Sequence, residues 1–140
     1  IKTQYANFSE LNTEKLRLNT IEASEQCERL DVPEIMEISS LEKSLEHCKN
    51  RVIYLCLENS KALPVNEMLH THDINKKCAF MVGPEGGFSE DEVEFLLRQP
   101  NIVPVSLGPR ILRAETAVVA ILSCYQAIAG DWAIDHLFAR

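Results

Sequence analysis

The sequence predicts an α/β domain built on a parallel sheet. Nearly continuous apolar runs of strand length occur at 51–58, 78–82 and 102–107, and such runs are typical of strands that are buried on both faces. Helix-like segments lie between and after these runs, and an alternation of strands and helices is the pattern of α/β folds. The length of 140 residues fits one domain of this class.

Two helices are expected before the first strand. The spacing of Leu, Ile and Ala over 13–28 indicates an amphipathic helix that ends before Pro33. Ser39-Ser40-Leu41-Glu42 has the pattern of a capping box, in which a serine and a glutamate three residues apart satisfy the first backbone N–H groups of a helix. The helix after it would place three apolar side chains on one face: Leu41, Leu45 and Cys48.

The second half of the chain predicts two more helices. Ser89-Glu90-Asp91-Glu92 is another capping box whose acidic residues suit the positive end of a helix dipole, so a helix is expected from there to about Arg98. Residues 115–129 are apolar on nearly every face. A helix of this kind must be buried, and a small domain offers few such places except a subunit interface, so we expect a homodimer.

The connections are less regular. The stretch 59–77 is expected to be a loop with room for one short helix, and Pro104 places the strand 102–107 near an edge of the sheet. His70 and His72 would share a metal ion only in an extended segment. With no third ligand close in sequence, a surface loop is the favoured interpretation, and no metal is predicted.

The composition excludes several classes of protein. Apolar residues make up 46% of the chain, which excludes a disordered protein. With 14 basic and 21 acidic residues the net charge is −7, which argues against a surface that binds nucleic acid on its own. The five cysteines show no C-x-x-C spacing, so free thiols are expected. Since neither a signal peptide nor an apolar stretch of membrane-spanning length is present, we expect a cytoplasmic protein with no membrane partner.

Two glycine-containing loops suggest a ligand pocket. Gly83-Pro84-Glu85-Gly86-Gly87-Phe88 and the segment 107–117 each follow a strand-like run and lead into a helix-like run, so both would bring bare backbone to one ligand. The first loop has a glutamate, no lysine and no G-x-G-x-x-G spacing, which argues against a phosphate or dinucleotide and favours a neutral or cationic ligand. The alternative is that Gly86-Gly87 only forms a tight turn.

Three ordered motifs resemble one family. Residues 83–92 follow the pattern G-P-E-G-G-F/L-S-x-x-E, and residues 107–117 follow L-G-x-R-I-L-R-x-E-T-A. Upstream, 22–29 and 32–35 follow E-A-x-E-Q-x-x-R and V-P-x-I. Together these motifs are similar to those of the RsmE family, the 16S ribosomal RNA uridine-N3 methyltransferases of the SPOUT superfamily, and the resemblance extends from about residue 15 to residue 129.

The resemblance implies a fold, a cofactor and partners. It implies a parallel-sheet SPOUT methyltransferase fold with a trefoil knot near the C-terminus, S-adenosyl-L-methionine as cofactor, and 16S ribosomal RNA or the small ribosomal subunit as the partner of the full-length protein. Residues 1–140 would then be the methyltransferase domain, cut short at its N-terminus because the chain starts at Ile1 without an initiator Met. The N-terminal PUA-like RNA-binding barrel of the family is expected to be absent from this chain.

By the resemblance, the ends of three strands form the cofactor pocket. The expected cofactor-binding residues are Leu57, Glu58, Gly83, Pro84, Glu85, Gly86, Gly87, Leu107, Gly108, Ile111 and Leu112. A side chain at one of the glycines would hold the backbone away from the adenosine, so Gly86→Val is expected to abolish binding. Core packing is the alternative role for the side chains of Leu107, Ile111 and Leu112, and a strand-end surface charge is the more frequent role for a residue such as Glu58.

Methylation at N3 of uridine needs loss of a weakly acidic proton, so a group that stabilises the resulting anion is expected. Arg113 is the first candidate for that role or for binding phosphate, and Arg110 is the second, with a solvated charge as its alternative. Glu115 is a candidate general base, but its place near a helix N-terminus favours a structural cap or an ion pair with Arg113.

Three functions are consistent with the motifs. The leading one is an RsmE-type methyltransferase acting on ribosomal RNA. The second is a SPOUT methyltransferase for a transfer RNA site. The pattern at 107–117 argues against this function because it resembles the RsmE group specifically. The third is a noncatalytic domain that binds adenosylmethionine or RNA, which the intact motifs disfavour.

Overall fold

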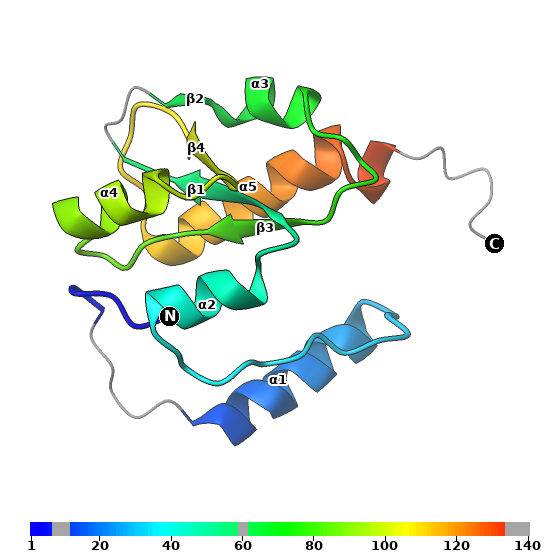
Figure 1. Cartoon of the computed structure of the whole chain (residues 1–140). Coiled ribbons are helices and arrows are strands. Elements are labelled where there is room, and N and C mark those ends of the chain that lie inside the picture. The colour runs from blue at the N-terminus through cyan, green and yellow to red at the C-terminus, as the bar shows by residue number, and fades with distance from the viewer. Residues whose placement is uncertain (7–11, 59–61, 134–140) are drawn as a thin grey trace.

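A four-stranded parallel sheet forms the centre of the protein. The computed structural model describes residues 1–6, 12–58 and 62–133. The strands are β1 (Val52–Cys56), β2 (Leu63–Pro64), β3 (Cys78–Met81) and β4 (Ile102–Ser106), in the spatial order β2-β4-β1-β3 (Figure 1). All three pairings are parallel. The predicted α/β class and its three main strands are therefore confirmed.

Five α-helices accompany the sheet in the described part of the chain. They are α1 (Thr13–Gln26), α2 (Leu41–His47), α3 (Val65–His70), α4 (Glu90–Leu97) and α5 (Ala114–Ile128), and a short 3-10 turn follows at Asp131–Ala133. The four predicted helices are confirmed, with ends within two residues of those expected. None of the described helices is both long and apolar enough to cross a membrane.

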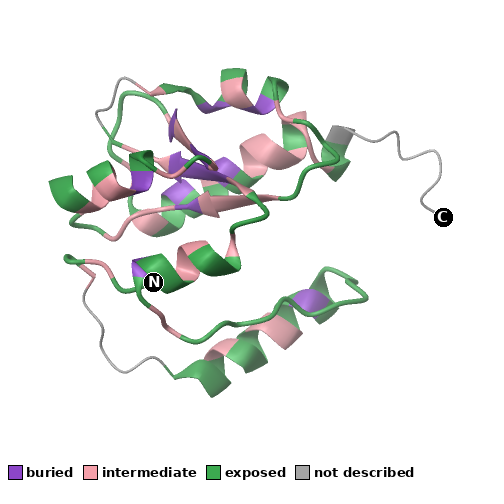
Figure 2. Ribbon diagram, viewed as in Figure 1, coloured by how far each residue is buried: buried purple, intermediate pink, exposed green. Residues whose placement is uncertain are grey.

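The sheet separates two apolar clusters because neighbouring residues of a strand point to opposite faces. On one face, Ile53 and Leu55 of β1 pack with residues of α2 and α4 such as Leu96. On the other, Tyr54 packs with residues of α3 and α5 such as Ile121. The buried residues gather around the sheet in Figure 2. Burying an aliphatic side chain of this size contributes about 1.5 to 3 kcal/mol, so these clusters are the main source of the domain's stability.

The two predicted capping boxes have different outcomes. At α4 the box is present: Ser89 Oγ accepts from Glu92 N–H at 3.2 Å, and Glu92 Oε2 accepts from Ser89 N–H at 2.9 Å. At α2 the box at Ser39 is wrong, because the N-cap is Ser40, whose hydroxyl accepts from a backbone N–H at 3.3 Å. The Ser39 hydroxyl instead lies 2.8 Å from that of Ser44. Leu41, the first residue of α2, is buried as predicted.

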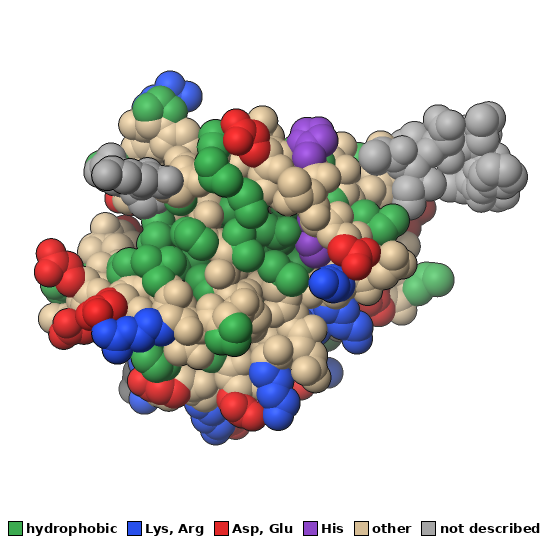
Figure 3. All heavy atoms as spheres, turned by 45° about the horizontal axis from the view of Figure 1, so that its top comes forward, with side chains coloured by type: hydrophobic (Ala, Val, Ile, Leu, Met, Phe, Trp, Pro, Cys, Tyr) green, Lys and Arg blue, Asp and Glu red, His purple; other side chains and the backbone are tan. Residues whose placement is uncertain are grey.

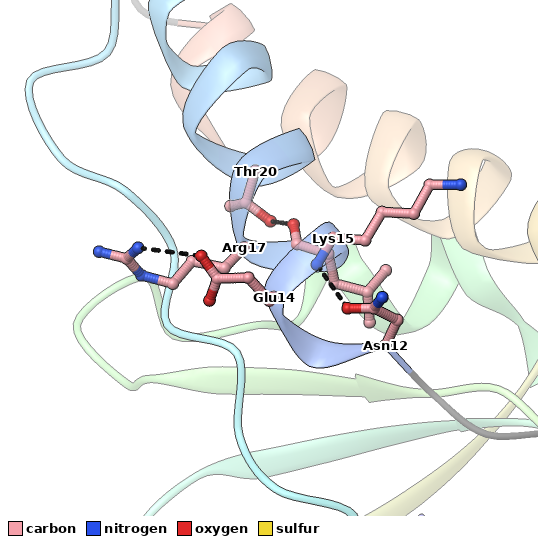
Figure 4. Close-up of polar contacts among 6 residues, drawn as sticks. Asn12, Glu14, Lys15, Arg17 and Thr20 are labelled. Atoms are coloured by element: carbon pink, nitrogen blue, oxygen red, sulfur yellow. Dashed lines mark hydrogen bonds and ion pairs between the residues drawn. The ribbon is translucent and has the colours of Figure 1, made fainter.

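Helix α1 is held mainly by its own polar contacts. Asn12 Oδ1 caps it by accepting from Lys15 N–H at 2.9 Å, and the Thr20 hydroxyl donates to a carbonyl one turn earlier (Figure 4). In Figure 1 it lies beyond α2 from the sheet. Ser24 is its only buried residue, and Leu18 is 56% exposed. The helix is thus confirmed, whereas the buried apolar stripe expected of an amphipathic helix is not found on it.

The region 62–77 contains more structure than a loop. It forms β2 and α3, and residues 59–61 of the predicted loop lie outside the described part of the chain. The single-helix expectation is confirmed by α3, but the two-residue strand was missed because it is too short to show a periodicity. Pro104 pairs with Leu55 of β1, and β4 lies next to the edge strand β2, with which Val105 and Ser106 pair. This agrees with its expected place near an edge.

His72 is not a surface-loop residue. Its Nδ1 lies 2.9 Å from the hydroxyl of Tyr54, and its ring packs edge-on against Tyr125. His70 ends α3, and its Nδ1 lies 2.6 Å from the carbonyl oxygen of Asn66. Within residues 1–6, 12–58 and 62–133, no group of three His, Cys, Asp or Glu side chains is placed to hold a metal ion.

Candidate functional site

A cavity of about 320 Å³ lies at the carboxyl ends of β1, β3 and β4. The chain segments that follow these three strands form its walls. Ligands of open α/β sheets bind in this position because the strands end at one edge and the loops after them diverge. The lining residues are Cys56, Leu57, Glu58, Val82, Gly83, Pro84, Gly86, Gly87, Phe88, Val93, Leu107, Gly108, Arg110, Leu112, Ala114 and Ala117.

Most of the residues expected to bind a cofactor line this cavity. They are Leu57, Glu58, Gly83, Pro84, Gly86, Gly87, Leu107, Gly108 and Leu112. Two expected residues do not line it: Glu85, which is exposed, and Ile111, which is 69% exposed. The tertiary structure therefore brings the two glycine loops together at one place, although β1 separates β3 from β4 in the sheet.

Several lining residues were not predicted. Phe88 directly follows the first glycine loop, Val93 lies one turn into α4, and Ala114 and Ala117 lie on the first turns of α5. The small size of the two alanines is the sequence signal that was available, since it leaves room beside a helix. Cys56 and Val82 end their strand-like runs, where the pattern shows only that they are apolar.

The four glycines of the cavity serve different needs. Gly87 and Gly108 have φ of 70° and 105°, and a Cβ at either position would meet no atom within 4 Å. They are required by the backbone conformation, which L side chains rarely adopt. A Cβ at Gly83 would lie 3.1 Å from the ring of Phe88, and one at Gly86 would lie 2.7 Å from Cβ of Tyr5. These two glycines make room for neighbouring side chains.

Most side chains of the lining are apolar, and two of them are charged, one of each sign. Glu58 and Arg110 are its charged residues, both exposed at the protein surface, and it contains no lysine. Glu85, on which the expectation of a cationic ligand partly depended, lies outside the lining. Any selection for positive charge inside the cavity therefore depends on Glu58, against the positive charge of Arg110.

Cys56 contributes a thiol to the cavity wall. Burial raises the pKa of this thiol to about 11, because the thiolate would lose its hydration. Near neutral pH the side chain is therefore a neutral thiol and a poor nucleophile. The described cysteines are all free, as expected.

The three candidate catalytic residues are only partly brought together. Arg110 lines the cavity, while Arg113 and Glu115 are exposed and do not line it. Arg113 is the N-cap of α5, and its carbonyl accepts from Ala117 N–H at 2.8 Å. Glu115 lies in the first turn of α5, where a carboxylate favours the helix dipole. Among the ion pairs of the described residues, none joins Arg113 to Glu115.

Sequence comparison gives the chain a family context. Residues 1–126 match the family described as RNA methyltransferase domain. The chain is 36% identical over 124 residues to the ribosomal RNA small subunit methyltransferase E of Rickettsia conorii, covering 86% of this chain and 49% of the relative. It is 34% identical over 107 residues to the protein of the same name from Bacillus subtilis, covering 73% of this chain and 41% of the relative. The chain thus spans about half the length or less of these curated relatives.

A solved structure has the same fold. The ribosomal RNA small subunit methyltransferase E of Neisseria gonorrhoeae, bound to S-adenosyl methionine, superposes with a TM-score of 0.75 at 28% identity. The match covers 91% of this chain and 54% of that one. Agreement over nearly the whole chain indicates that the sheet and its helices are arranged alike in the two proteins.

Proposed function

The chain belongs to the RNA methyltransferase domain family, in its RsmE group, and from this premise we propose that it binds S-adenosyl-L-methionine and methylates N3 of a uridine in 16S ribosomal RNA. The observation that carries the proposal is the cavity at the carboxyl ends of β1, β3 and β4, where both glycine loops meet. The solved relative from Neisseria gonorrhoeae, bound to S-adenosyl methionine, supports the choice of cofactor.

The residues of the cavity fit this cofactor. Its volume of about 320 Å³ lies at the lower end of the range of small-molecule pockets. Leu57, Leu107 and Leu112 offer apolar surface for an adenosine group, and the glycine loops offer backbone N–H and C=O groups without side chains in the way. The lining has no lysine, and its one cation, Arg110, is exposed at the surface. When bound, the cofactor supplies the methyl group.

The chain's own residues would then position uridine and favour its anion. Methylation removes the N3 proton and forms an N3–carbon bond while the carbon–sulfur bond breaks. Arg113, at the N-cap of α5, or Arg110, which lines the cavity, would stabilise the negative charge of a deprotonated uracil, and Glu58 is the carboxylate of the lining. The neutral thiol of Cys56 would not compete for the methyl group, because a thiol is a far weaker nucleophile than a thiolate.

Binding of RNA is proposed to need more than this domain. The net charge of −7 is unfavourable for a polyanion. On the face seen in Figure 3, hydrophobic side chains gather in the middle, and acidic and basic ones lie around them. We therefore propose that 16S ribosomal RNA is bound with the help of a PUA-like barrel in the full-length protein, which would act in the cytoplasm.

We propose a homodimer in which α5 lies at the interface. Val118, Val119 and Leu122 of this helix are 42%, 65% and 44% exposed, so an apolar face of α5 is left without cover by the described residues of this chain. The loop that precedes α5 lines the cavity. A partner on this face would therefore sit beside the site.

We also propose the trefoil knot of SPOUT enzymes for the segment that contains β4, its loop and α5. The non-sequential strand order supports it, because β4 returns to the far side of β1 from β3. An experimental structure of the full-length protein with a continuous backbone trace tests it.

The proposed activity is tested with the full-length protein, labelled S-adenosylmethionine and small ribosomal subunits or 16S ribosomal RNA. We expect N3-methyluridine, detected by mass spectrometry of digested RNA. Transfer RNA serves as the alternative substrate, since a SPOUT enzyme for transfer RNA would modify it instead. Cofactor binding without transfer to either RNA would favour a noncatalytic binding domain. The shared name of the curated relatives supports ribosomal RNA as the substrate.

A further inference from the structure

The N-terminal segment lies against the first glycine loop at Gly86, and Tyr5 is not among the residues that line the cavity. A Cβ at Gly86 would approach Cβ of Tyr5 to 2.7 Å and Cγ of Tyr5 to 3.2 Å. Side-chain carbons do not tolerate a contact of 2.7 Å, and the Tyr5 Cβ cannot turn away because it is fixed to the backbone. Gly86 has no positive φ, so its backbone conformation does not demand glycine. The lack of a side chain at Gly86 therefore serves contact with Tyr5.

Glu92 ties this segment to the start of α4. Its Oε1 accepts from the backbone N–H of Gln4 at 2.8 Å, and its Oε2 accepts from the backbone N–H of Ser89 at 2.9 Å. A single carboxylate thus joins two stretches of backbone that are more than eighty residues apart in sequence. Hydrogen bonds to an ionised acceptor are stronger than neutral ones, so this link holds Tyr5 in register with the loop.

A second attachment fixes the other end of the segment. Lys2 N–H donates to the carbonyl of Ser39 at 2.8 Å, and Lys2 forms a parallel bridge with Ser40, the N-cap of α2. The segment is therefore held at α2 through Lys2 and at α4 through Gln4, and Tyr5 directly follows Gln4. Gly86 lies opposite Tyr5 and lines the cavity.

We propose that the N-terminal segment is a working part of the ligand site: Tyr5 supports the glycine loop from behind at Gly86, and Glu92 is a positioning residue that holds Tyr5 there. The loop carries its own turn bond, from Gly87 N–H to the Pro84 carbonyl at 2.8 Å, and the support keeps that turn in the shape that faces the ligand. The inference rests on the proposed function only in naming S-adenosylmethionine as the ligand.

Paired substitutions at positions 5 and 86 test the contact in the full chain. Gly86→Ala should weaken binding of S-adenosylmethionine by about tenfold in titration calorimetry, which is an ordinary coupling energy for residues in contact. In a Tyr5→Gly background, which has no Cβ at position 5, the same change should cost less than about threefold. Tyr5→Ala is the matched control, because alanine keeps the Cβ and should leave the full penalty of Gly86→Ala in place.

Hydrogen exchange of the Gly87 backbone amide is a measurement that needs no ligand. Gly86→Ala should speed this exchange when residue 5 is tyrosine or alanine. In the Tyr5→Gly background, Gly86→Ala should leave the exchange rate close to that of the Tyr5→Gly protein alone. Equal effects of Gly86→Ala in all three backgrounds would overturn the proposal and make Gly86 a residue that the ligand itself needs bare. If the unaltered protein binds no S-adenosylmethionine, the proposed function fails, and the exchange pattern alone still decides whether Tyr5 supports the loop.

Substitution of Glu92 separates positioning from helix capping. Glu92→Gln leaves one acceptor oxygen for two N–H groups, so exchange at both Gln4 and Gly87 should rise. Ser89→Ala is the control, because it removes the reciprocal bond from Glu92 N–H to Ser89 Oγ and leaves both carboxylate contacts intact. Equal effects of the two substitutions on Gly87 would show that Glu92 acts only as a cap, and would contradict its positioning role.

Discussion

Gly83 and Phe88 pack against each other at the two ends of the first glycine loop. A Cβ at Gly83 would lie 3.1 Å from Cε2 and 3.2 Å from Cδ2 of the Phe88 ring. Phe88 also packs against the apolar cluster shared by the sheet, α2 and α4, and it lines the cavity. The ring therefore links the loop to the core, and the absence of a side chain at Gly83 makes that link possible.

Gly83→Ala should destabilise the protein by about 1 kcal/mol, because overpacking of the ring outweighs the usual gain from replacing glycine. In a Phe88→Leu background the same substitution should be neutral or stabilising. Urea unfolding of the four proteins measures this coupling. Gly87→Ala is the control, since its φ of 70° and open surroundings make its cost independent of Phe88. A Gly83→Ala penalty that ignores Phe88 would contradict the packing role.

Cys56 should resist alkylation. Its pKa is raised to about 11 by burial, so its thiolate fraction at pH 8 is about a hundredfold below that of a thiol with the reference value of 9.0. Iodoacetamide should therefore label the exposed Cys27 first, with site-by-site rates read by mass spectrometry. S-adenosylmethionine should slow labelling of Cys56 further and leave Cys27 unchanged. Labelling of both at one rate would contradict the burial of Cys56.

The raised pKa of Cys56 also predicts that the protein loses stability at alkaline pH. The unfolded chain loses this thiol proton at a lower pH than the folded protein, so unfolding becomes more favourable as pH rises from about 9 to about 11. Cys56→Ala should remove this part of the pH dependence in urea unfolding, because alanine has no proton to lose. An unchanged slope between these pH values would show that other groups cause it.

Disrupting the apolar face of α5 should yield monomers. Val119 is 65% exposed on that helix, and Val119→Glu would place a charge in the proposed dimer interface. We expect light scattering to report a dimer for the unaltered protein and a monomer for the variant at micromolar concentration. Leu18→Glu on α1 is the control, since Leu18 is similarly exposed but lies on another helix. A monomeric unaltered protein would refute the proposed dimer.

Arg110 and Arg113 should differ in their effects on catalysis. In the full-length protein, Arg110→Ala should lower both cofactor affinity and methyl transfer, because Arg110 lines the cavity and its guanidinium can pair with the carboxylate of the cofactor. Arg113 does not line it, so Arg113→Ala should leave cofactor affinity nearly intact while lowering methyl transfer by about a hundredfold if it stabilises the uracil anion. Titration calorimetry and single-turnover methyl transfer measure the two quantities. Unchanged transfer in Arg113→Ala would remove this residue from the mechanism.

The local signals in the sequence were sufficient for most elements. Apolar runs without alternation predicted β1, β3 and β4, and the capping box at Ser89 and Glu92 fixed the start of α4, because both signals depend on residues close together in the chain. The box at Ser39 failed because two serines stand side by side and the local pattern does not choose between them. The short strand β2 exists only through its pairing with β4, which no local pattern reports.

The candidate site also has features that the sequence predicts and features that depend on the tertiary structure. The sequence alone showed which loops are rich in glycine, and its resemblance to a known family implied nine of the residues that line the cavity. Only the tertiary structure decided that Gly86 faces Tyr5, that Glu85 and Ile111 do not line the cavity, and that Phe88 does. The reason is physical: backbone conformation and strand length are set by near neighbours in the chain, whereas the direction of a side chain and the partner that it meets depend on segments brought together by the fold.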